Sequence, residues 1–95
     1  MMMPVHPGRI LKRELAARDL SANALALSLR VPSGRITDIL NGHRAITPDT
    51  ALRLGRYFGN APRFWLNLQT GYDLTTAEQK IGERIAIEVQ VAPAA

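Results

Sequence analysis

Two short segments with helical periodicity, residues 21–29 and 33–41, are separated by only three residues, and this spacing restricts the fold more than any other feature of the sequence. Their apolar residues recur at helical rather than alternating positions: Leu25, Ala26 and Leu29 in the first segment, and Ile36, Ile39 and Leu40 in the second. Ala26 is small where the two helices are expected to cross, and a larger side chain there would hold them apart. The two segments match the layout of a helix-turn-helix.

The link between the two segments departs from the usual composition of such a turn. Arg30 stands where glycine is common, and Pro32 stands where a capping serine or threonine is common. A left-handed residue other than glycine costs only about 1 kcal/mol, which the core contacts of Val31 can offset. Pro32 fixes its own φ and favours an extended Val31. We therefore predict a stiff turn, and a second helix that begins at Ser33 without a capping hydroxyl.

The rest of the chain is also cut into helical pieces by proline, glycine and capping residues. Ser21 caps the first helix of the pair, and Asn41-Gly42 supplies a left-handed exit from the second. Four more helices are predicted: from Pro7 or Gly8 to about Arg18, from Thr47-Pro48 to Gly59, from Pro62 to Gly71, and a sixth from Thr76. Residues 85–91 fit either a continued helix or a half-buried strand, and helix is favoured because a lone strand needs a partner. The predicted fold class is all-α.

Size and charge narrow the function. The chain has 95 residues, enough for one domain, and it has no cysteine, so its stability must come from packing or from dimer formation. Residues 1–72 carry ten basic and four acidic side chains, a balance of +6, whereas residues 73–95 carry two and four, a balance of −2. Ten of the twelve cations are arginine, which suits contacts to phosphate and guanine. No signal peptide or membrane span is evident, which predicts a cytoplasmic protein.

The second helix of the pair would lie in the major groove with its N-terminal residues at the bases. Its groove-facing positions are Ser33, Gly34, Thr37 and Asp38, with Arg35 between them. Only Arg35 is a long bidentate donor, for either guanine or phosphate. Asp38 can accept from a cytosine amine or orient Arg35, and an ordinary surface ion pair between the two is the alternative. Arg44 is assigned to the backbone or the minor groove. Ser21 and Asn23, at the start of the helix that crosses the backbone, complete the predicted DNA-binding residues.

Other kinds of site have little support in the sequence. His6 and His43 stand in separate turns with no carboxylate at metal-ligand spacing, so His6 is interpreted as a helix cap and His43 as a loop residue. No phosphate loop, nucleophile elbow or paired-carboxylate motif occurs, and no catalytic residue, metal or cofactor is expected. Phe64 and Trp65 are predicted to belong to the core, with an exposed platform for base stacking as the alternative.

Four blocks together resemble the HigA-type antitoxins of bacterial toxin-antitoxin modules, within the Xre or lambda-repressor-like class. They are HPG at 6–8, LRVPSGRITDILNG at 29–42, ITPDTALRL at 46–54 and FWLNLQTGYDL at 64–74. The resemblance implies a five-helix lambda-repressor-like domain over residues 4–75 and a C-terminal helix and tail over 76–95. It also implies a homodimer that binds operator double-stranded DNA, represses its own operon and binds a small RelE/HigB-like ribonuclease toxin.

Two residues depart from the pattern of the family, and two other functions stay open. Ser33 stands where relatives often have a second proline, and Ala61 stands where a capping hydroxyl before Pro62 is usual, a loss of about 1 kcal/mol of helix stability. A regulator without a toxin, or an interaction module without DNA binding, would have the same fold. The apolar stripe at 81–91 could bind toxin, close the dimer or cover the domain itself.

Overall fold

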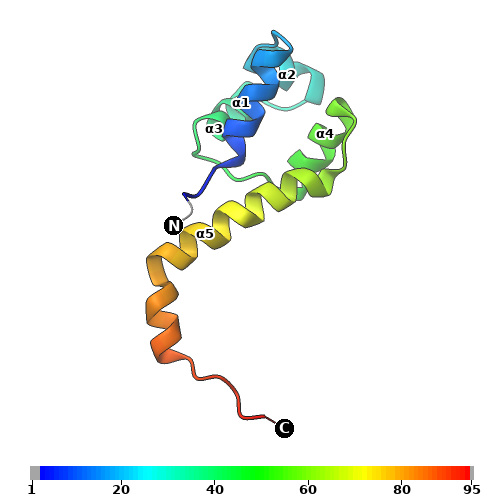
Figure 1. The fold of residues 1–95 in the computed structure, drawn as a ribbon. Helices are drawn as coiled ribbons and strands as arrows, with labels where there is room; N and C mark the ends of the chain where they lie inside the picture. Colours follow the sequence, from blue (N-terminus) through cyan, green and yellow to red (C-terminus); the bar gives the residue numbers. More distant parts are fainter. Residues whose placement is uncertain (1–2, 95) are drawn as a thin grey trace.

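The structure is a computed structural model that describes residues 3–94 and consists of five helices. They are α1 (Pro7–Ala17), α2 (Ala22–Leu29), α3 (Ser33–Leu40), α4 (Pro48–Phe58) and α5 (Pro62–Glu88). Helices α1 to α4 form a compact cluster, and the first half of α5 runs along one side of it (Figure 1). Residues 3–94 contain no strand, which confirms the all-α class and answers the question about residues 85–91: α5 continues to Glu88 and the chain is then irregular.

The ends of the helices confirm most of the predicted caps. The Ser21 hydroxyl oxygen accepts from Ala24 N at 3.0 Å at the start of α2. The Thr47 hydroxyl oxygen accepts from Thr50 N at 3.4 Å at the start of α4. Gly42 and Gly59 are left-handed, with φ of 77° and 76°, after the ends of α3 and α4. Ala61 forms no side-chain hydrogen bond at the start of α5, as its missing hydroxyl predicts.

The turn between α2 and α3 has the backbone conformation that its residues predict. Arg30 is left-handed, with φ 62° and ψ 43°, and the backbone N–H of Val31 returns to the carbonyl of Ala26 at 3.0 Å. Pro32 precedes α3 in an extended conformation and gives it no side-chain cap. Val31 packs against the core, as expected of the residue that offsets the cost of a left-handed arginine.

One core connects all five helices. Its buried apolar side chains are Leu11, Leu15, Leu25, Ala26, Leu29, Ile36, Ile39, Ile46, Ala51, Leu54 and Trp65. Ala26 is 1% exposed at the crossing of α2 and α3, as its size predicts. Helix α1 meets α3 at Gly8, where an added Cβ would overlap the carbonyl group of Ile39. The core therefore holds α3 from one side and leaves its other face to solvent.

The predicted break in the last helical region is wrong. We expected one helix to end at Gly71 and another to begin at Thr76, but α5 is continuous from Pro62 to Glu88. A glycine inside a helix costs only about 1 kcal/mol, and tertiary contacts on both sides of Gly71 offset it. Gln69 accepts from the backbone N–H of Ile46 at 2.7 Å, and the ring of Tyr72 lies 4.9 Å from that of His6.

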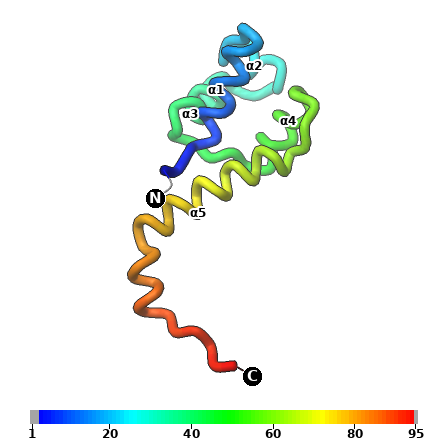
Figure 2. Tube along the Cα trace, in the orientation of Figure 1, coloured from blue at the N-terminus to red at the C-terminus, as the bar shows by residue number. Residues whose placement is uncertain are grey.

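The second half of α5 projects away from the other helices and ends far from the N-terminal segment (Figure 2). Leu74, Ile81 and Ile85 are exposed along it, so this stripe does not cover the domain of its own chain. The helix crosses the predicted boundary between residues 75 and 76, and the division into two parts stays a prediction. Ala95, the last residue of the predicted C-terminal part, lies outside the described residues. No helix among those described is both long and apolar enough to cross a membrane.

Candidate nucleic-acid interface

The outer face of α3 presents small polar groups. Ser33, Gly34 and Thr37 are exposed, and their spacing places them on one side of the helix. The hydroxyl of Thr37 donates to the carbonyl of Ser33 at 3.1 Å, so it meets a ligand as an acceptor while that bond holds. A Cβ added at Gly34 would meet no other atom within 4 Å. Another molecule can therefore approach the α3 backbone closely at Gly34.

Arg35 and Asp38 do not form the ion pair that the sequence offered as one alternative. Arg35 Nη1 instead donates to Asp49 Oδ1 at 2.8 Å, across the gap between α3 and α4. Asp38 pairs with Arg44 of the following loop, with 3.5 Å between Arg44 Nη2 and Asp38 Oδ2. Both charged side chains of α3, Arg35 and Asp38, therefore pair with a residue outside their own helix.

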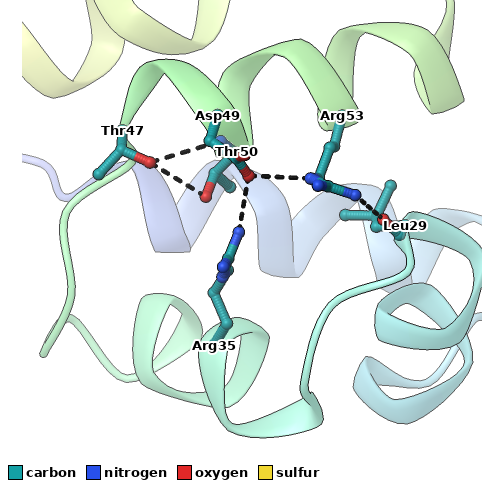
Figure 3. A network of polar contacts seen from close by, with 6 residues as sticks. All are labelled: Leu29, Arg35, Thr47, Asp49, Thr50 and Arg53. Atoms are coloured by element: carbon teal, nitrogen blue, oxygen red, sulfur yellow. Dashed lines mark hydrogen bonds and ion pairs between the residues drawn. The ribbon is translucent and has the colours of Figure 1, made fainter.

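Asp49 also joins Arg35 to a second arginine (Figure 3). Arg53 Nε donates to Asp49 Oδ1 at 2.8 Å, and Arg53 Nη1 donates to the carbonyl oxygen of Leu29 at 2.9 Å. These hydrogen bonds from Arg53 and Arg35 hold the pKa of Asp49 below its ordinary value. The three side chains thus connect α4 with α3 and with the last turn of α2.

Sequence reasoning missed Asp49 and Arg53 as parts of the site. Their spacing of four residues along a helix does indicate an ion pair, and that signal was available. The contact with Arg35 spans 14 residues and depends on how α3 and α4 pack, so no local pattern indicates it.

The two residues predicted at the start of α2 are accessible. Ser21 and Asn23 are both exposed, on either side of the first helical residue, Ala22. The oxygen of the Ser21 hydroxyl caps the helix, which leaves its hydrogen free to donate to an anion.

The loop that carries Arg44 is held by buried polar contacts. Gln69, 6% exposed, accepts from the backbone N–H of Ile46 at 2.7 Å. His6 caps α1, as predicted, by accepting from Gly8 N through Nδ1 at 2.9 Å. Burial lowers the pKa of His6 from its ordinary 6.5, while a hydrogen bond with the Arg44 backbone and the charge of Asp73 act in the opposite direction. His6 therefore stays neutral at pH 7 and keeps its acceptor role.

Acidification is expected to weaken the fold through His6. Because its pKa is lower in the folded chain than in the unfolded one, the unfolded chain binds the proton first, and stability falls as the pH drops below about 6.5. Denaturant unfolding at pH 7.5 and pH 5.5 measures this difference. His6→Asn, which keeps a capping acceptor but does not titrate, should reduce it, whereas His43→Asn in the exposed loop should not. An equal loss of stability in the His6→Asn variant would contradict the assignment.

Comparison with known proteins places the chain in a family. The family model for the helix-turn-helix domain matches residues 11–66. The chain is 54% identical over 79 residues to virulence-associated protein I of Dichelobacter nodosus, covering 82% of this chain and 73% of the relative. It also superposes on an addiction module antidote protein of the HigA family from Coxiella burnetii with a TM-score of 0.94 and 53% identity, over 96% of this chain and all of the other. The chain belongs to the helix-turn-helix family of HigA-type antitoxins.

A second HigA-type antitoxin was solved with DNA. The Pseudomonas aeruginosa antitoxin HigA with the higBA promoter superposes with a TM-score of 0.93 and 42% identity, over 96% of this chain and 100% of that one. The family resemblance drawn from the four sequence blocks is thereby confirmed. The antitoxins and regulators that the chain matches are not enzymes, in agreement with the expectation drawn from its motifs.

Proposed function

We propose that this chain binds operator DNA through α3 in the major groove and represses its own operon. The observation that carries the proposal is the exposed face of α3, whose core-facing side is fixed by Ile36 and Ile39, both 0% exposed. The Pseudomonas aeruginosa HigA structure with promoter DNA supports the same use of the fold here. The excess of basic side chains in residues 1–72, a balance of +6, supports an anionic partner.

The proposed contacts differ in kind. Ser33, Gly34 and Thr37 offer short side chains and open backbone, so they bring the helix close to the base edges. Asp38 accepts from a cytosine amine or holds Arg44, with which it pairs. Arg44, whose side chain is 51% exposed, contacts phosphate or the minor groove. Ser21 and Asn23 contact the DNA backbone from the start of α2.

The proposed protein partners are a second copy of the chain and a toxin. Similarity to HigA-type antitoxins supports a small RelE/HigB-like ribonuclease as the protein that this chain neutralises by direct binding. The exposed stripe of Leu74, Ile81 and Ile85 supplies an apolar surface for a dimer or for the toxin. Residues 73–95 carry a balance of −2, which suits a basic partner.

Titration of the purified protein with a duplex from upstream of its gene tests DNA binding, with a scrambled duplex of equal length for comparison. We expect Arg44→Ala to lower the slope of log affinity against log salt by about one, since one phosphate contact is lost. Arg84→Ala is the matched control, because Arg84 is also exposed and paired, with Glu88 at 3.4 Å, but lies near the end of α5. Equal slopes for the parent and Arg44→Ala would remove Arg44 from the interface. No preference of the parent for the upstream duplex would overturn operator binding.

Two measurements test the partners. Light scattering gives the mass in solution, for which we expect a dimer. Co-expression with the product of the adjacent open reading frame tests neutralisation: growth should be restored, and the two proteins should copurify. The absence of a toxin gene beside this one would favour a regulator without a toxin, and the absence of salt-dependent DNA binding would favour an interaction module.

A further inference from the structure

Arg35 differs from the other predicted DNA contacts because its side chain is held by Asp49 of α4, and α4 is in turn bonded to the end of α2. Its guanidinium donates to Asp49, which also accepts from Arg53, and Arg53 is itself fixed on the carbonyl of Leu29 (Figure 3). The Arg35 side chain is 29% exposed, compared with 51% for Arg44. An arginine held in this way loses little conformational freedom when it meets a ligand.

We propose that Asp49 is a positioning residue that makes Arg35 a reader of guanine rather than of phosphate. The proposal rests on the proposed function, in which α3 lies in the major groove. It predicts a guanine at one position of each operator half-site. It also makes Asp49 contribute to sequence specificity without touching DNA.

The geometry leaves Arg35 able to make such a contact. A guanidinium has five N–H donors, and the bond from Nη1 to Asp49 uses one of them. The remaining donors include pairs that can reach the O6 and N7 acceptors of guanine together. A bidentate contact needs a fixed plane, and the bond to Asp49 restricts rotation of the guanidinium about its long side chain.

Electrostatics distinguishes guanine from phosphate. The ionised carboxylate of Asp49 lies 2.8 Å from Arg35 Nη1 and repels an approaching phosphate, whereas O6 and N7 of guanine carry no formal charge. Arg53 contacts the same carboxylate oxygen, so the negative charge of Asp49 is shared between two arginines and does not fully neutralise Arg35. By contrast, Arg44 and Asp38 are 3.5 Å apart, and Arg44 is more free to move to a phosphate.

The test compares Asp49→Asn and Arg35→Ala with the parent protein on the operator duplex and on a scrambled duplex over a series of salt concentrations. Arg35→Ala should reduce the preference for the operator about tenfold and leave the salt slope unchanged. Asp49→Asn should also reduce the preference, but it should tighten binding to the scrambled duplex and raise the salt slope by about one, because the freed arginine reaches phosphate.

Glu14→Gln is the matched control for the change of charge. Glu14 pairs with Arg18 at 3.5 Å on α1, and the Arg18 guanidinium lies over the ring of Phe58, at the end of α4 opposite to Asp49. The variant gains the same unit of positive charge, so any effect of Asp49→Asn beyond that of Glu14→Gln comes from release of Arg35 and Arg53. The part of that effect that is lost when Arg35→Ala is combined with Asp49→Asn belongs to Arg35.

A substitution in the DNA identifies the base without altering the protein. Replacing operator guanines one at a time by 7-deazaguanine removes the N7 acceptor, and at one position per half-site this should weaken the parent but not Arg35→Ala. If no position shows this dependence, or if Arg35→Ala lowers the salt slope as Arg44→Ala does, Arg35 binds phosphate and the inference is wrong. If the parent prefers the operator and both Arg35→Ala and Asp49→Asn keep that preference, the inference about Arg35 and Asp49 is wrong, but the proposed operator binding still holds.

Discussion

Replacing Gly34 by leucine is expected to lower operator affinity at least about 100-fold, or ~2.7 kcal/mol, without weakening the fold. Gly34 is the second residue of α3, it is exposed, and a Cβ added there meets no protein atom within 4 Å. The leucine side chain would therefore occupy the space that the proposed complex gives to base edges. Glycine is also a poor helix former, so the folded domain should gain about 0.5–1 kcal/mol.

The combination of a more stable protein with lost binding makes this variant informative. Fluorescence anisotropy with the operator duplex measures affinity, and denaturant unfolding measures stability. Ala17→Leu is the control, because Ala17 is exposed at the end of α1, outside the α2–α3 pair. Operator affinity unchanged by Gly34→Leu would show that α3 does not enter the groove at this position.

The features of this fold that could be predicted from the sequence depend on neighbouring residues. Ser21 and Thr47 cap helices by bonding to backbone N–H groups three residues ahead. The turn at Arg30 and Pro32 follows from the conformations that these residues allow, and the core face of α3 follows from the spacing of its isoleucines. In each case the interactions that decide the conformation join residues within about one helical turn of each other, so the sequence pattern predicts the structure.

The features that could not be predicted depend on packing between helices. Gly71 was predicted to end a helix, but α5 continues through it. The neighbouring Tyr72 contacts the ring of His6, which is distant in the sequence, and no local pattern indicates this contact. The partner of Arg35 is Asp49 because the fold brings the start of α4 within reach of the Arg35 side chain, whereas the charge pattern along α3 alone offered Asp38. Gly8 is required where α1 crosses the Ile39 carbonyl, a contact that the HPG block does not indicate by itself. The partners of the candidate site residues therefore could not be predicted from local patterns, and the assignment of those residues to DNA stays a prediction.

Trp65→Ala should have the largest effect on stability. Trp65 is 0% exposed at the contact of α4 with α5, as predicted, whereas Phe64 is 44% exposed and does not belong to the core. The Trp65 ring lies 5.7 Å from that of Phe58 and 5.1 Å from that of Phe64. Removing a buried aromatic side chain costs about 3–5 kcal/mol, a large share of the roughly 5–15 kcal/mol that stabilises a domain. Denaturant unfolding followed by circular dichroism at 222 nm measures the loss, and a midpoint equal to that of the parent would contradict the burial.

Trp65→Phe separates the role in the core from base stacking. Phenylalanine keeps an aromatic ring but loses the hydrogen bond from Trp65 Nε1 to Asn60 Oδ1, 2.9 Å long. Because Asn60 is exposed and water can replace the lost donor, the cost should be about 1–2 kcal/mol, which includes the smaller ring. A buried ring cannot stack on a base, so at a temperature where Trp65→Phe is folded its operator affinity should lie within about twofold of the parent. A much larger loss of affinity in a fully folded variant would mean that the α4–α5 contact sets the position of α3, since burial excludes direct contact of Trp65 with DNA.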